Sequence, residues 1–105
     1  MLNEDLVRSS LKNVIDPEIG LNIVDLGLIY GVDIRDEGRQ VVVNMTLTTP
    51  ACPAGPQIIE QAHKEVKELN AVHPELQEVN INLVWTPFWN PEMMSQDARD
   101  ELGFF

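Results

Sequence analysis

The strongest constraint on the fold is a change of hydrophobic period across a proline-rich connection between residues 46 and 56. From Gln40 to Thr48 apolar side chains stand mostly at alternate positions, which is typical of a half-buried strand. After the connection they recur at helical spacing, at Ile58, Ile59, Ala62, Val66 and Leu69. The sequence therefore predicts a strand over 40–48, a stiff loop and a helix over about 54–70.

The remaining segments complete a small α+β pattern. In chain order we expect a helix over 3–14, a loop over 16–30, strands over 28–34 and 75–85, and short helices near residues 90 and 95–102. Asn3 precedes two acids, which is typical of a capped helix start, and the buried stripe of that helix is expected to extend to Ile15. A short turn over 36–39 makes the first two strands an antiparallel hairpin. We predict a small, mostly antiparallel sheet of about three strands packed against two main helices, with short C-terminal helices.

Length and charge limit the classes of function. A chain of 105 residues is expected to form a single domain over 1–105. Seven basic against seventeen acidic residues give a net charge of −10, which opposes binding to nucleic acid or to anionic membranes. No leader opens the sequence and no apolar run approaches the ~20 residues of a membrane span. We therefore expect a cytoplasmic protein.

Cys52 is the only cysteine, and it lies just before the expected second helix. A helix N-terminus favours the thiolate, which is the form that binds metals or attacks electrophiles. A free cysteine is also often a small buried apolar residue, but the surrounding prolines and Gly55 favour a functional role. One cysteine and two histidines cannot supply the four Cys or His ligands of a closed zinc site. A metal site built on Cys52 must therefore be shared with a partner or a second copy.

Three other groups of side chains are candidates for a site. Thr46 and Thr48 are expected on the strand face away from the core, which leaves Thr49 to line the loop. Asp25 lies between Val24 and Leu26, where it either caps a turn or faces a site. A C-terminal set forms either a packed lid or an exposed partner surface, with packing the default: Trp85, Phe88, Trp89, Met93 and Met94.

Three motifs together resemble one known family. They are Asp16-Pro-Glu with Asp25-Leu-Gly-Leu-Ile-Tyr30, then Thr48-Thr-Pro-Ala-Cys-Pro53, then Trp85-Thr-Pro-Phe-Trp-Asn-Pro91. This combination is similar to the SufT/PaaD-like family of small iron-sulfur cluster assembly (maturation) factors, over most of the chain. The resemblance implies that Cys52 matters for iron-sulfur protein maturation and that Asp25 is the acid of the family's Asp-Leu-Gly-Leu segment. PaaD-type members carry a cysteine-rich C-terminal extension that does not follow here, which favours a stand-alone maturation factor.

The resulting hypothesis is a non-enzymatic factor that assists iron-sulfur cluster assembly or delivery to client proteins. Cys52 is expected to be a transient ligand for a cluster or iron, with Thr49 and Asp25 beside it. A cluster normally takes about four thiolates, so iron-sulfur client or scaffold proteins, or a homodimer, are expected to complete the site. Two alternatives stay open: a thiol-dependent redox enzyme that uses Cys52, and an accessory subunit of a multicomponent oxygenase.

Overall fold

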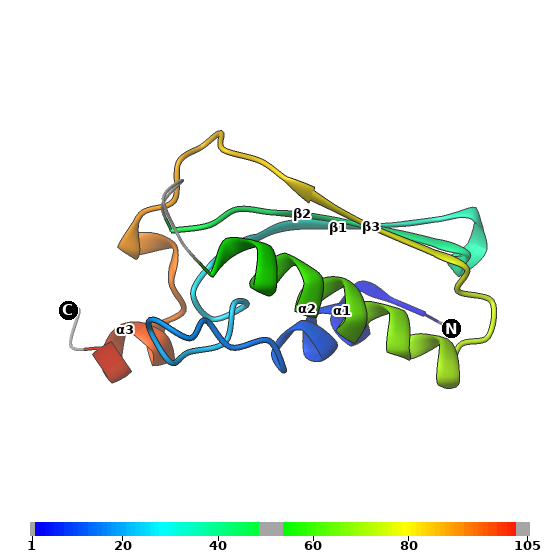
Figure 1. Ribbon diagram of the computed structural model, residues 1–105, viewed down its shortest axis with the longest axis horizontal. Coiled ribbons are helices and arrows are strands. Elements are labelled where there is room, and N and C mark those ends of the chain that lie inside the picture. Colours follow the sequence, from blue (N-terminus) through cyan, green and yellow to red (C-terminus); the bar gives the residue numbers. More distant parts are fainter. Residues whose placement is uncertain (1, 49–53, 103–105) are drawn as a thin grey trace.

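The computed structural model describes residues 2–48 and 54–102, and of Leu102 the backbone alone. Its helices and strands are α1 (Glu4–Leu11), β1 (Ile29–Arg35), β2 (Gln40–Met45), α2 (Gly55–Lys67), β3 (Glu78–Leu83) and α3 (Gln96–Leu102), with short 3₁₀ turns at Asp36–Gly38, Glu68–Ala71 and Pro91–Met93. The strands form one sheet in the order β1-β2-β3, and α1 and α2 both lie on one face of it (Figure 1). The predicted α+β fold, with two main helices and short C-terminal ones, is confirmed.

The sheet is mixed because its two connections differ in length. β1 and β2 form the expected antiparallel hairpin, with Ile34 opposite Val41 and Arg35 opposite Gln40. β3 pairs with β2 in parallel, from Gln40 opposite Glu78 to Met45 opposite Leu83. A parallel neighbour needs a long crossover, and α2 supplies it by returning the chain to the end where β2 began.

The core lies between the sheet and the two helices. The predicted inward face of the second strand is confirmed, since Val41, Val43 and Met45 are completely buried. The apolar stripe of α2 packs on this face, and Ile58, Ala62 and Val66 are also completely buried. Burial of each large apolar side chain contributes about 1.5–3 kcal/mol to the free energy of folding. The fold therefore rests on the two periodicities that flank the proline-rich connection.

Thr46 contradicts the expectation that it faces away from the core. It is completely buried, one residue beyond the end of β2 at Met45, where the chain still lies beside the residue before β1. There the Thr46 N–H donates to the Leu28 carbonyl oxygen at 2.9 Å. Strand parity therefore fails to predict the exposure of Thr46, although it correctly predicts that the next residue, Leu47, is buried.

The first helix is capped as expected but shorter than predicted. Asn3 Oδ1 accepts the Leu6 N–H at 2.8 Å, and α1 ends at Leu11 rather than near Val14. Ile15, predicted to belong to the buried stripe, is 45% exposed because it forms an isolated antiparallel bridge with Asn22 instead of a further helical turn. Among the described residues, no helix is long and apolar enough to cross a membrane.

Candidate functional site

Three connections meet at one end of the sheet, which we call the loop end. They are the turns over residues 16–28, the connection from β2 to α2 in its described parts (residues 46–48 and 54), and the strap, defined as residues 84–95 (Figure 1). The predicted helix start is confirmed, since α2 begins at Gly55, three positions after Cys52 in the sequence. Cys52 and Thr49 themselves lie outside the described residues, so their roles stay predictions.

The start of α2 packs closely against the end of β2. Gly55 is buried, and a Cβ built on it would lie 2.8 Å from Leu47 Cδ1. Leu47 is itself only 6% exposed. Because Gly55 has no side chain, the first turn of α2 can lie directly against Leu47.

Three hydrogen bonds fasten the strap to the segment that precedes and begins β1. They are Tyr30 Oη to the Pro87 carbonyl at 2.8 Å, Trp89 Nε1 to the Leu26 carbonyl at 2.6 Å, and the Ser95 N–H to the Asp25 carbonyl at 2.7 Å. Met94 is buried, whereas Phe88 is 72% exposed. Packing, the default prediction for the aromatic and methionine set, therefore holds for Met94 and Trp89 but not for Phe88.

Asp25 lies in a capped turn whose capping side chain is that of Asn22, not its own. Its N–H donates to Asn22 Oδ1 at 2.9 Å, and its carboxylate accepts a hydrogen bond from Asn22 Nδ2 at 2.8 Å. Its carbonyl oxygen is the acceptor for Ser95, so the same residue also holds the end of the strap. The side chain is half-buried, and its predicted part in cofactor binding stays a prediction.

Asp16 is a second acid that shapes this end of the molecule. It is 1% exposed, and its Oδ1 accepts the Glu18 N–H at 2.8 Å, which is an Asx turn. Its carbonyl oxygen also accepts the Gly20 N–H at 2.7 Å. The sequence signal for this role is the Asp16-Pro-Glu motif, in which proline follows the acid.

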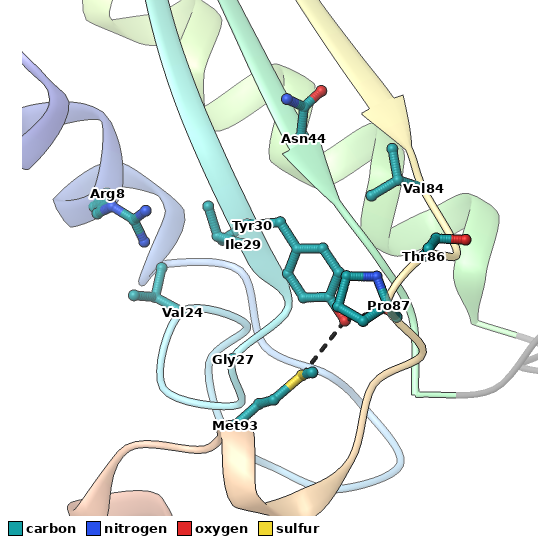
Figure 2. Close-up of a pocket in the computed structure, with 10 residues that line it drawn as sticks. All are labelled: Arg8, Val24, Gly27, Ile29, Tyr30, Asn44, Val84, Thr86, Pro87 and Met93. Atoms are coloured by element: carbon teal, nitrogen blue, oxygen red, sulfur yellow. Dashed lines mark hydrogen bonds between the residues drawn. The ribbon is translucent and has the colours of Figure 1, made fainter.

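An open cavity of about 800 Å³ lies between β1, the strap and α1 (Figure 2). Val24, Ile29 and Val84 give it apolar walls, and Tyr30 points from β1 across it toward Pro87 and Met93. Tyr30 Oη lies 3.4 Å from Met93 Sδ. Burial raises the pKa of Tyr30 above its ordinary value, so the hydroxyl remains protonated and serves as a donor at neutral pH.

Sequence reasoning did not find this cavity, although Tyr30 belongs to one of the motifs. Its lining comes from α1, the turns over 16–28, β1, β2 and the strap, and the separation between Tyr30 and Met93 is 63 residues. In residues 2–48 and 54–102 no group of three or more His, Cys, Asp or Glu side chains is placed to hold a metal ion. The described part of one chain thus offers a cavity with both apolar and hydrogen-bonding groups, and no metal cage.

Comparison with known proteins assigns the chain to a family. A family model described as iron-sulfur cluster assembly protein matches residues 4–83, from α1 to the end of β3. The chain belongs to the iron-sulfur cluster assembly protein family. The predicted resemblance is thereby confirmed over most of the chain.

Similar proteins cover nearly the whole of this family member. The Fe-S protein maturation auxiliary factor SufT of Staphylococcus aureus is 51% identical over 90 residues, which are 86% of this chain and 97% of that protein. An Fe-S protein maturation auxiliary factor of Porphyromonas gingivalis is 48% identical over 101 residues, 96% of this chain and 90% of that protein. The crystal structure of a DUF59 domain from Bacillus anthracis has a TM-score of 0.84 at 40% identity and covers 97% of this chain and 92% of its own.

The strap extends beyond the stretch that the iron-sulfur cluster assembly family model matches. That stretch ends at residue 83, and the strap begins at residue 84. The alignment with the Porphyromonas gingivalis protein includes 101 of the 105 residues, so it takes in most of the strap as well. Most of the strap therefore lies within the stretch over which this chain and that protein align.

Proposed function

We propose that this member of the iron-sulfur cluster assembly family is a non-enzymatic factor that assists cluster assembly or delivery to client proteins, with Cys52 as a transient thiolate ligand. The observation that carries the proposal is the position of the only cysteine, between the end of β2 and the start of α2. The positive end of a thirteen-residue helix favours a thiolate in the loop that precedes it. Family membership supplies the chemistry in which such a thiolate takes part.

The cluster is cargo rather than a resident cofactor in this proposal. A stable cluster takes about four thiolates, and each copy of this chain contributes one. An iron-sulfur client or scaffold protein, or a second copy, supplies the other ligands during transfer, in the cytoplasm. A single weak attachment suits a delivery factor, because the cluster must leave again. Thr49 and Asp25 are proposed to shape the loop end around the cluster.

The proposal is tested by replacing the thiol and measuring clusters in a client. Cells that lack the wild-type protein receive the wild type, Cys52→Ser or Ser9→Ala, an exposed serine of α1 whose loss should be neutral. A client enzyme is then purified anaerobically, and its iron and acid-labile sulfide are measured. We expect a reduced cluster content with Cys52→Ser alone. Equal cluster content with Cys52→Ser and wild type would show that the thiol has no such role.

A further inference from the structure

β1 is an edge strand whose outer side is open. The sheet order leaves β1 paired only with β2. Among the described residues, no backbone hydrogen bond outside the ladder with β2 involves the segment Ile29–Arg35. Its outward N–H and C=O groups are therefore available to another strand, which is the usual way in which one sheet extends into a second chain.

The side chains of this edge alternate in a self-complementary way. Asp33 and Arg35 stand on the face away from the helices, because Asp33 lies opposite Val42 while the inward Ile34 lies opposite Val41. They form an ion pair, Arg35 Nε to Asp33 Oδ2, at 2.6 Å, and the side chains of Asp33 and Arg35 are 51% and 56% exposed. Ile34 between them is half-buried. The strand thus offers one acid and one base two residues apart, with an apolar residue at the centre.

We propose that β1 pairs with β1 of a second copy, antiparallel about a twofold axis at Ile34, to form a continuous six-stranded sheet. In this register each Asp33 lies opposite the partner's Arg35, and Ile34 lies opposite the partner's Ile34. Directly opposed charges of unlike sign stabilise an antiparallel pair, and like charges destabilise it. An axis at Asp33 would oppose two aspartates, and an axis at Val32 would leave both charges without an opposite charge.

Charge identifies a second copy as the occupant of this edge. The whole chain carries −10, so most surfaces of two copies repel one another. The strand Ile29–Arg35 contains one acid and one base, so its own net charge is zero. Across a twofold axis, an acid and a base at i and i+2 also face the base and the acid of the other copy, and a twofold axis is the symmetry that two identical chains commonly adopt.

This pairing leaves the loop end of each copy free. Ile29 lies five residues from the axis, or about 17 Å at the ~3.3 Å rise of a strand, so the two loop ends are about 33 Å apart. The cavity beside Ile29 and Tyr30 also stays uncovered, because the ladder centred on Ile34 is short. The second copy is thus held at the hairpin end of the sheet, and the inference depends on β1 alone rather than on the role of Cys52.

Two variants with opposite charge test the register. Asp33→Arg makes the pair all-cationic and Arg35→Asp makes it all-anionic, so each variant alone meets like charges across the axis. A mixture of the two restores both opposite pairs in a heterodimer. The controls are Glu60→Arg and Lys64→Asp, which make the same charge changes on the exposed side of α2. Self-association is measured by sedimentation equilibrium at about 0.15 M salt, where screening acts beyond about 8 Å.

We expect a weak wild-type dimer, with Kd between about 1 μM and 1 mM, because the ladder is short. Asp33→Arg and Arg35→Asp, each alone, should raise the Kd of the dimer roughly tenfold or more, whereas the two control variants should leave the Kd unchanged. The mixture of Asp33→Arg and Arg35→Asp should return the Kd to the wild-type level. Circular dichroism of each variant alone verifies that the monomer is folded.

Three results would overturn the proposal. The first is a wild-type chain that stays monomeric at about 1 mM, as expected if β1 instead receives a strand from a client. The second is a dimer that both variants leave intact, which would place the interface elsewhere. The third is a pair of monomeric, folded variants that fail to associate when mixed.

Discussion

Gly27 lets the strap lie directly against the turn before β1. Its φ is +80°, in the left-handed region that favours glycine, and a Cβ built there would overlap the Met93 carbonyl oxygen and lie 2.7 Å from the Met93 carbonyl carbon. Gly20 has a similar φ of +85°, but a Cβ at that position would have nothing within 4 Å. The two glycines therefore have similar φ values, but only Gly27 lies against the strap.

Gly27→Ala should destabilise the protein more than Gly20→Ala does. Both variants carry the left-handed cost of about 1–2 kcal/mol, and only Gly27→Ala also displaces backbone of the strap, for a total loss of about 2–4 kcal/mol. Urea denaturation gives the free energy of unfolding for each variant. Equal losses at the two positions would mean that the contact with Met93 contributes nothing.

Tyr30 gives the fold a dependence on alkaline pH. Because burial raises its pKa in the folded state, the neutral phenol contributes stability that is complete below the unfolded-state value of about 10 and is lost as the pH rises through the folded-state value. Tyr30 is the only tyrosine, so ultraviolet absorbance of tyrosinate reports it directly.

Tyr30→Phe should remove the part of the stability loss at alkaline pH that comes from ionisation of Tyr30. At neutral pH the variant should lose about 0.5–1.5 kcal/mol, because the hydrogen bond to the Pro87 carbonyl disappears. Thermal unfolding between neutral pH and about pH 11 compares the two chains against the tyrosinate titration. A wild-type phenol that titrates at or below its ordinary pKa would contradict the expectation.

At the scale of the elements, α2 packs into the core, whereas α1 ends before Ile15. Two isoleucines, Ile58 and Ile15, allow this difference in burial to be tested. Ile58 on α2 is completely buried, whereas Ile15 after α1 is 45% exposed. Ile58→Ala should cost about 2–5 kcal/mol in free energy of unfolding, because it removes apolar contacts and leaves a cavity. Ile15→Ala, the same chemical change, should cost less than about 1 kcal/mol. A similar loss in both, measured by denaturant unfolding, would show that Ile15 is buried as the helical pattern predicted.

The sequence was most informative where an element has one buried face. Val41, Val43 and Met45 alternate, Ile58 and Ala62 recur at helical spacing, and both faces are where the pattern placed them. The parallel pairing of β3 could not be derived in this way, because alternation within a strand does not specify the direction of its neighbour.

The candidate site was less predictable than the elements. Thr46 is completely buried, with its N–H bonded to Leu28, and the cavity is lined by residues from α1, the turns over 16–28, β1, β2 and the strap. Such positions are set by contacts between distant segments, which no local period encodes. The prediction for Cys52 rests instead on a local signal, a lone cysteine between prolines before a helix, and it stays a prediction.

In the molecule as a whole, the two ends of the sheet have different neighbours. The loop end collects the turns over 16–28, the start of α2 and the strap, whereas the hairpin end carries the open part of β1 with Asp33 and Arg35 (Figure 1). The proposed pairing of two copies uses the hairpin end, and the proposed transfer of clusters uses the loop end. A dimer of this kind presents two independent loop ends to clients rather than one shared site.

The fastening of the strap has a consequence for the order in which a new chain matures. Trp89 bonds to Leu26 across 63 residues, and Tyr30 bonds to Pro87 across 57. Synthesis proceeds from the N-terminus, so the turn that receives the strap is made long before the strap exists. β1, β2 and α2 are all synthesised before the strap. The loop end can be completed only after residue 95 has left the ribosome. The turns over 16–28 are therefore made before the strap that covers them, and the loop end is the last part of the molecule to be completed.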